Sequence, residues 1–228
     1  MREGDLIISL LSQWNDLAAG LFLLCAFGMV AMRQTLACLW LFIVQSVFFG
    51  ISAFLIGAKP FAWDLITVGI LNFLTKLFLI PWMLRRTVRA EVYARREIVQ
   101  ALNIPTSLLI ALGLTVLAYF VAAPMLTAVG GTRYAAVNLP IGLAALLLGV
   151  YTLTVRREAV PQLIGLLAME NGAFFAGIAI VPGLSLIAEL AIAFDALMLA
   201  FVMGVLARAI QEHVGTTEAG ALAALKEH

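Results

Sequence analysis

The chain has 228 residues, of which 64% are hydrophobic and 12% are charged, with a formal net charge of +1. A soluble domain carries about twice that share of charged residues, and the mean hydropathy here is +1.07. This composition excludes an ordinary soluble enzyme. It predicts an all-α fold: a polytopic membrane helical bundle without a separate soluble domain.

Seven apolar stretches are long enough to cross a bilayer as helices, at a rise of about 1.5 Å per residue. They cover about 17–32, 35–57, 61–84, 104–126, 135–155, 160–181 and 185–208. Cys25 and Cys38 lie in or beside these stretches, and without clustered histidines we interpret them as small core residues. The first stretch follows the acidic Asp5 and Asp16 and lacks a clear cleavage site, so we expect no cleavable signal peptide.

Basic residues in the connecting segments predict the orientation of the bundle. With seven spans, one side collects three of them, namely Arg2, Lys59 and Arg133. The other side collects ten, namely Arg33, Arg85, Arg86, Arg89, Arg95, Arg96, Arg156, Arg157, Arg208 and Lys226. The positive-inside rule therefore predicts an N-terminus outside and a C-terminus in the cytoplasm.

The spans and loops divide the protein into three predicted regions. Residues 1–134 form an N-terminal four-helix membrane region, 135–210 a three-helix region and 211–228 a cytoplasmic tail. The polar segment 85–100 is either a basic loop that sets the topology or a docking surface for a cytoplasmic partner.

Four ionisable residues lie well inside predicted spans: Lys76, Glu170, Glu189 and Asp195. A carboxylate at the centre of a bilayer costs roughly 2.5 kcal/mol or more on insertion scales, which makes each acid a functional candidate. Glu170 and Asp195 lie on either side of the turn at Gly183, each roughly 18–20 Å along its helix from that turn. In antiparallel helices these two acids therefore share one level.

Lys76 lies roughly 13 Å from the cytoplasmic end of its span, within reach of the level of the two acids. Burial favours the neutral form of each group and mutual proximity favours the charged forms. Such a cluster responds to small changes in hydration, as a proton relay requires. Glu189 lies about 9 Å further out than Asp195. Asn171 and Asn72 are possible polar relay residues. For all of these residues, fixing helix packing is the alternative role.

Several motifs carry a resemblance to a known family. They are Leu-Ala-Met-Glu-Asn-Gly at 167–172, Phe-Asp-Ala at 194–196 with Val-Leu-Ala-Arg at 205–208, Leu-Thr-Lys-Leu-Phe-Leu-Ile-Pro at 74–81 and Ala-Leu-Lys at 224–226. Together they resemble the hydrogenase-4 component E family over nearly the whole sequence. Such proteins are membrane-arm subunits of complex I-like assemblies, including group 4 nickel–iron hydrogenases and formate hydrogenlyase-type systems.

The last three spans, about 135–208, also resemble the K subunit of complex I and the C subunit of Mrp antiporters. Those subunits have three helices, with one acid in the second and another in the third. Asp195 falls on the third-helix acid. In the relatives, the run Leu-Ile-Gly-Leu is followed directly by Glu. Here this run, 163–166, is followed by Leu167, and the acid comes at Glu170, about 4.5 Å further along the helix.

The resemblance implies a non-catalytic subunit of a proton-pumping oxidoreductase, multi-pass in the cell inner (plasma) membrane. Glu170 and Asp195 would carry protons, and Lys76 would modulate them. We expect no metal or cofactor in this protein and no nucleic acid. A nickel–iron centre and iron–sulfur clusters would belong to cytoplasmic redox subunits, with antiporter-like subunits as membrane partners. The alternatives are an Mrp-type cation/proton antiporter subunit and a purely structural membrane adaptor.

Overall fold

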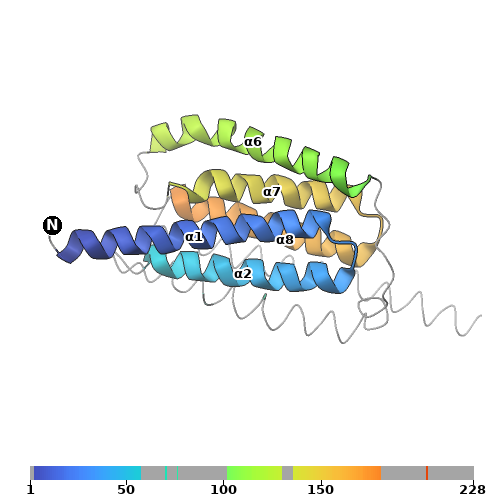
Figure 1. The fold of residues 1–228 in the computed structure, drawn as a ribbon, viewed down its shortest axis with the longest axis horizontal. Coiled ribbons are helices and arrows are strands. Elements are labelled where there is room, and N and C mark those ends of the chain that lie inside the picture. The colour runs from blue at the N-terminus through green and yellow to red at the C-terminus, as the bar shows by residue number, and fades with distance from the viewer. Residues whose placement is uncertain are drawn as a thin grey trace, which may run out of the picture.

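The computed structural model describes residues 3–57, 70, 76, 102–129, 136–180 and 204. This part of the protein forms helices and no strand (Figure 1). The helices are α1 (Glu3–Ala31), α2 (Thr35–Gly57), α6 (Ile104–Val129), α7 (Asn138–Val155) and α8 (Ala159–Ile180). All five are long and apolar enough to cross a membrane. The prediction of an all-helical protein is thereby confirmed for the described residues, and these helices are compatible with a membrane protein.

The five helices match five of the seven predicted spans. The predicted spans 61–84 and 185–208 lie outside the described residues, apart from single positions, so the count of seven and the orientation stay predictions. The main difference is at the start of α1, which begins at Glu3 and not near residue 17. Acidic residues interrupt the hydropathy there, but they are favourable near the N-terminus of a helix. Asp16 is accommodated within α1 because its side chain is exposed.

α7 and α8 form an antiparallel pair, with α1 and α6 packed against α7 and α2 packed against α8. α1 and α2 also pack against each other, so these two and the α7–α8 pair build one four-helix core, with α6 outside it (Figure 1). Residues from all four helices meet in one buried apolar cluster, which includes Phe22, Phe42, Leu148 and Phe175. The core thus joins helices of the two predicted membrane regions.

Glycines allow the backbones of α7 and α8 to touch. Gly142 and Gly149 lie seven residues apart on α7, and Gly165 and Gly172 lie seven apart on α8, so each pair occupies one face after about two turns. A Cβ on Gly149 would collide with the backbone of Met169. Small residues at such positions are typical of helix pairs in membranes, where close van der Waals contact replaces the hydrophobic effect.

A closed ring of hydrogen bonds joins α1, α2 and α7 near the end of the bundle where α2 finishes. Asn15 Nδ2 donates to Asn138 Oδ1 (2.8 Å), Asn138 Nδ2 donates to Ser52 Oγ (2.7 Å), and Ser52 Oγ donates to Asn15 Oδ1 (2.6 Å). All three side chains are buried. Each group donates to the next around this amide–hydroxyl ring, and Asn138 Nδ2 makes a second, longer bond to Asn15 Oδ1 at 3.4 Å. In such an arrangement the bonds strengthen one another. The ring therefore fixes the register of three helices.

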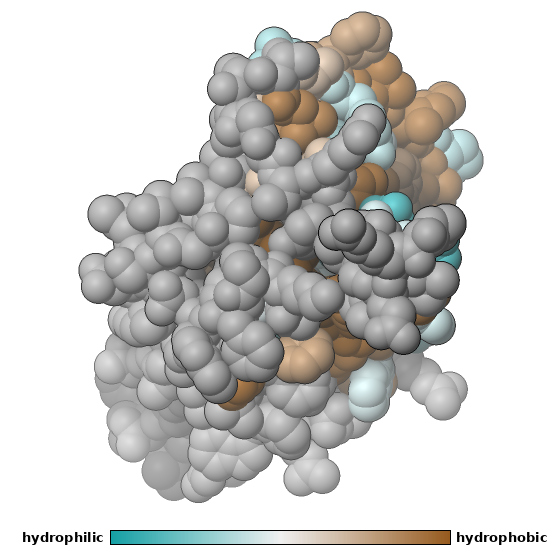
Figure 2. All heavy atoms as spheres, turned by 90° about the vertical axis from the view of Figure 1, so that its left-hand side faces the viewer, coloured by the Kyte–Doolittle hydropathy of each residue, from teal (hydrophilic) through white to brown (hydrophobic). Residues whose placement is uncertain are grey.

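The outward sides of α6 are apolar. Leu109 and Phe120 are 70% and 75% exposed, whereas the small Ala111 and Ala118 are buried toward the bundle. Figure 2 shows hydrophobic side chains over the upper part of the face it presents, where α6 lies. A helix that exposes large apolar side chains in this way suits a lipid environment.

The glycine contacts predict a large difference between two substitutions of the same type. Gly149→Ala should destabilise the protein by about 1–3 kcal/mol, because the added methyl meets backbone that cannot move aside. Gly113→Ala in α6 is the matched control, since a Cβ there meets nothing within 4 Å. Thermal unfolding in detergent, followed with a thiol-reactive dye that reports the two buried cysteines, measures both. Equal melting temperatures for the two variants would contradict the close α7–α8 contact.

The amide–hydroxyl ring generates a second stability prediction. Ser52→Ala should cost about 1–2 kcal/mol, because it removes a donor to Asn15 and an acceptor for Asn138 in an apolar interior. Ser107→Ala is the control: Ser107 is equally buried, and its hydroxyl has no hydrogen-bond partner among the described residues. The same unfolding assay should show no loss for Ser107→Ala. A loss that is the same in both variants would mean that the ring adds no stability.

Candidate functional site

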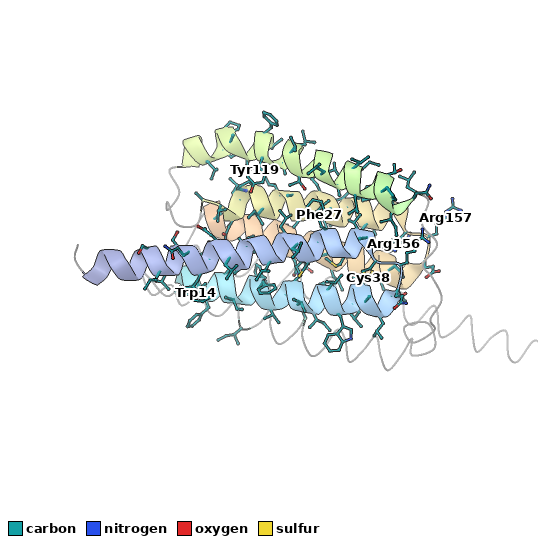
Figure 3. All side chains as sticks on the ribbon, in the orientation of Figure 1. Trp14, Phe27, Cys38, Tyr119, Arg156 and Arg157 are labelled. Carbon is teal, nitrogen blue, oxygen red and sulfur yellow. The ribbon has the colours of Figure 1, made fainter. Side chains whose placement is uncertain are left out.

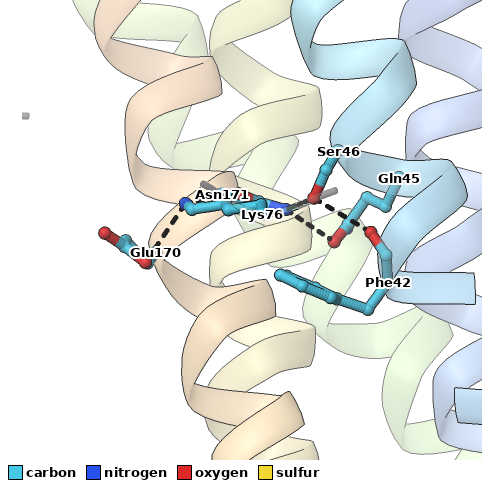
Figure 4. A network of polar contacts seen from close by, with 6 residues as sticks. All are labelled: Phe42, Gln45, Ser46, Lys76, Glu170 and Asn171. Carbon is cyan, nitrogen blue, oxygen red and sulfur yellow. Dashed lines mark hydrogen bonds and ion pairs between the residues drawn. The ribbon is translucent and has the colours of Figure 1, made fainter. Parts of the chain in front are cut away.

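The candidate site lies between α8 and α2 and is built around Lys76. The Lys76 Nζ lies 3.1 Å from Glu170 Oε2 and donates a hydrogen bond to Asn171 Oδ1 at 2.7 Å. Gln45 and Ser46 of α2 complete this group of five residues, which we call the lysine cluster (Figure 4). Each of the five side chains is at most 1% exposed. Within the described residues, it is the group that brings opposite charges together in the bundle interior.

The hydrogen bonds of the lysine cluster all run in one direction. An ammonium group donates and cannot accept, so it turns the oxygen of Asn171 toward itself. The amide nitrogen of Asn171 then faces α2 and donates to Ser46 Oγ at 3.0 Å and, more weakly, to Gln45 Oε1 at 3.4 Å. Ser46 Oγ in turn donates to the carbonyl oxygen of Phe42 at 3.0 Å. The lysine therefore sets the orientation of amides on two helices.

Glu170 and Asn171 reach the bundle interior because α8 packs so closely on α7. Both residues fall near the middle of α8 (Ala159–Ile180), between glycines that face α7. The ring of Phe174 covers the lysine from the next turn, with Lys76 Nζ 5.6 Å from the ring centroid. A cation over an aromatic face is stabilised by the ring quadrupole. The ammonium group is thus held by a carboxylate, an amide and a ring, without any exposed surface.

This arrangement suits the exchange of a single proton. The Lys76–Glu170 contact places a nitrogen donor next to a carboxylate oxygen, in surroundings where an uncompensated charge is costly. Any change in the protonation of one partner therefore changes the energy of the other. Among the described residues, no group of three His, Cys, Asp or Glu side chains is placed to hold a metal ion.

The structure brings together three of the residues singled out in the sequence. Lys76 contacts both Glu170 and Asn171, which are neighbours in the sequence. Asp195, Glu189 and Asn72 lie outside the described residues, and their places stay predictions.

Two further polar residues complete the site, Ser46 and Gln45. The sequence did not predict Ser46 as a site residue, because a serine in an apolar helix hardly changes the hydropathy of that helix. Gln45 is a polar residue in a span, for which hydrogen bonding between helices is the commoner role. In the structure its Oε1 accepts a hydrogen bond from Asn171 of α8.

The sequence predicts Arg156 as one of the basic residues of the loops. In the structure it is buried, at the opposite end of the bundle from the amide–hydroxyl ring. Its Nη2 donates to the carbonyl oxygens of Met29 at 2.8 Å and Met32 at 2.6 Å. These carbonyls end α1, where free acceptors and the helix dipole favour a cation. Figure 3 shows Arg156 beside Cys38 at this end. Burial lowers the pKa of the Arg156 guanidinium from its ordinary value, and an arginine nevertheless stays charged at neutral pH.

Comparison with known proteins finds a relative over nearly the whole length of the protein. None of the protein-family models matches the sequence, and no solved structure matches it. The protein is 31% identical over 212 residues to the uncharacterized protein Rv0085 of Mycobacterium tuberculosis, covering 93% of this protein and 96% of that one. The protein therefore belongs to the same family as the mycobacterial protein Rv0085.

Proposed function

We propose that this protein is a non-catalytic membrane subunit of a complex I-like oxidoreductase of the hydrogenase-4 type. In this proposal the lysine cluster is part of the path that couples redox chemistry in partner subunits to proton translocation. The support from the sequence is the set of motifs around Lys76, Glu170 and Asp195. The support from the structure is that two of these residues, 94 positions apart, form a fully buried ion pair at 3.1 Å.

The buried ion pair carries the proposal because such a pair is costly to keep. Removing two charges from water carries a desolvation penalty that their attraction often fails to offset, so apolar residues would hold the helices at least as well. Intramembrane ionisable residues are accordingly found mainly where ions or protons move. The directional hydrogen bonds from Lys76 toward α2 add a means of transmitting a change in charge to a second helix.

The step that these residues would perform is one proton transfer. A proton that arrives on Glu170 neutralises the carboxylate and leaves the Lys76 ammonium without its counter-charge. The ammonium is then favoured to pass its own proton on, and the neutral amine can take back the proton of Glu170. Asp195 would receive or supply this proton, at the level predicted from the turn at Gly183. Electron transfer would take place in the partner subunits.

The carrier role predicts a separation of transport from assembly. Glu170→Gln and Asp195→Asn keep size and hydrogen bonding but remove the titratable proton. Each should leave the complex assembled and lower coupled proton transport in membrane vesicles by at least about tenfold. The redox reaction with an artificial electron carrier should persist. Lys76→Met should act in the same direction more weakly. Glu158→Gln, in the segment between α7 and α8, is the matched control and should transport normally.

A purely structural ion pair gives the opposite pattern in the same experiment. Loss of one partner then strands a buried charge and costs assembly, by roughly 3–5 kcal/mol. The double variant Lys76→Met, Glu170→Gln would restore assembly. Normal pumping in the Glu170→Gln, Asp195→Asn double variant would exclude the relay.

The partner assignment has its own test. Extraction in mild detergent should recover the protein together with antiporter-like membrane subunits and cytoplasmic subunits that contain nickel and iron. Metal analysis should find nickel and iron in that complex and none bound to this protein once it is purified by itself. Recovery with a full set of Mrp antiporter subunits, and no redox subunit, would favour the antiporter alternative.

A further inference from the structure

Gln45 has a hydrogen-bond donor for which the described residues offer no acceptor. This donor is its Nε2, although the side chain is fully buried. The orientation of the amide is determined by its neighbours. Lys76 requires the oxygen of Asn171, so Asn171 presents its nitrogen to α2, and Gln45 must present its oxygen in return. The nitrogen of Gln45 therefore points away from Asn171 and needs an acceptor of another kind.

The face of α2 that carries Gln45 leads to the amide–hydroxyl ring. Gln45, Phe49 and Ser52 follow one another at intervals of four and three residues, which places them on one stripe of the helix. Gln45 belongs to the lysine cluster and Ser52 to the ring. Two polar sites therefore lie on the same stripe, about 10 Å apart along α2, with a phenylalanine between them.

Three phenylalanines from three helices fill the space between these sites. Phe22 of α1 stacks on Phe175 of α8 with centroids 4.1 Å apart, and Phe49 of α2 lies 6.2 Å from Phe175. All three are 0% exposed. Phe175 is one turn beyond Asn171 on α8, and Phe49 is one turn beyond Gln45 on α2. This phenylalanine layer therefore lies between the level of the lysine cluster and the level of the ring.

We infer that the lysine cluster exchanges protons with the ring end of the bundle along this stripe of α2. Water that accepts a hydrogen bond from Gln45 Nε2 carries the proton onward from the lysine cluster, without a transfer through the amides, and the phenylalanine layer is the barrier that keeps the rest of the path dry until it is opened. Water supplies the acceptor that Gln45 needs and can hand a proton on. Apolar constrictions stop conduction by excluding water. This inference rests on the proposed function and gives it a route.

The barrier is tested by measuring how fast silver ions reach a thiol placed in the lysine cluster. This measurement requires neither proton transport nor a partner subunit. The full-length protein is made with Cys25→Ala and Cys38→Ala to remove its own thiols, and with Ser46→Cys to place one in the lysine cluster. The purified protein is reconstituted in sealed vesicles, and silver ions, which are small enough for a path one water wide, are added to one side at a time. The reaction is read as the loss of later maleimide labelling in denaturant.

Phe49→Ala should raise the silver reaction rate of the introduced thiol by at least about tenfold, only from the side where α1 begins. Phe42→Ala is the matched control, because Phe42 is equally buried on the same helix but lies one turn before Gln45, whereas Phe49 lies one turn after it. It should leave access from that side unchanged. Phe22→Ala opens the same layer from another helix and should behave like Phe49→Ala, which guards against a folding defect in either variant.

Equal rates in the Phe49→Ala and Phe42→Ala variants, or faster access only from the other side, would overturn the inference. So would an unchanged rate in both Phe49→Ala and Phe22→Ala. The result is separate from the proposed function. The barrier can be disproved while Glu170→Gln still abolishes transport, and a barrier that opens as expected remains valid if the redox partners prove to be different.

Discussion

The Lys76 ammonium, held out of water, is the constraint on which the rest of the interior depends. It can donate hydrogen bonds and cannot accept one, so every acceptor near it must turn toward it. Glu170 supplies a charge and Asn171 supplies an amide oxygen. The orientations of the remaining amides are then fixed as well, since the nitrogen of Asn171 is left to donate to acceptors on α2. A single cation thereby determines hydrogen-bond directions across two helices.

The close contact between α7 and α8 makes this placement possible. Gly165 and Gly172 turn one face of α8 against α7. Asn171 precedes Gly172 by one residue, which rotates it by about 100° around the helix, toward α2. Larger side chains at the glycine positions would collide with the backbone of α7 and change the position of α8, which carries Asn171. The glycine pairs thus act on the site through the packing of α7 and α8.

Much of this arrangement could be predicted from the sequence, because it rests on hydropathy and on helical rise. The apolar stretches located the five described helices, and the rise per residue put Lys76 within reach of the level of Glu170. What could not be predicted is the bonding among neutral residues. Asn15, Ser52 and Asn138 lie in three different helices, and their ring depends on how those helices rotate about their axes. Sequence spacing fixes faces within one helix but not which faces of two helices meet.

The burial of Arg156 could not be predicted for a different reason. A basic residue just after an apolar stretch counts toward topology whether or not it faces water, and here it is only 2% exposed. Its position is explained by the end of α1, where the carbonyls of Met29 and Met32 accept its hydrogen bonds. The partner of such a residue lies more than 120 positions away, so local sequence gives no sign of it.

The two polar sites of the core differ in a way that bears on function. The amide–hydroxyl ring is closed, since each of its groups donates to the next and accepts from the one before, and none of them titrates near neutral pH. It can hold helices together but has no means of responding to a charge. The lysine cluster is open: it contains an acid, a base and, on Gln45, a donor that no described residue accepts. Burying such a donor is unfavourable, and exceptions of this kind in a well-bonded interior are where bound water or function is expected. The closed ring therefore suits the fixing of helix register, whereas the open lysine cluster has the titratable groups that the proposed proton path requires.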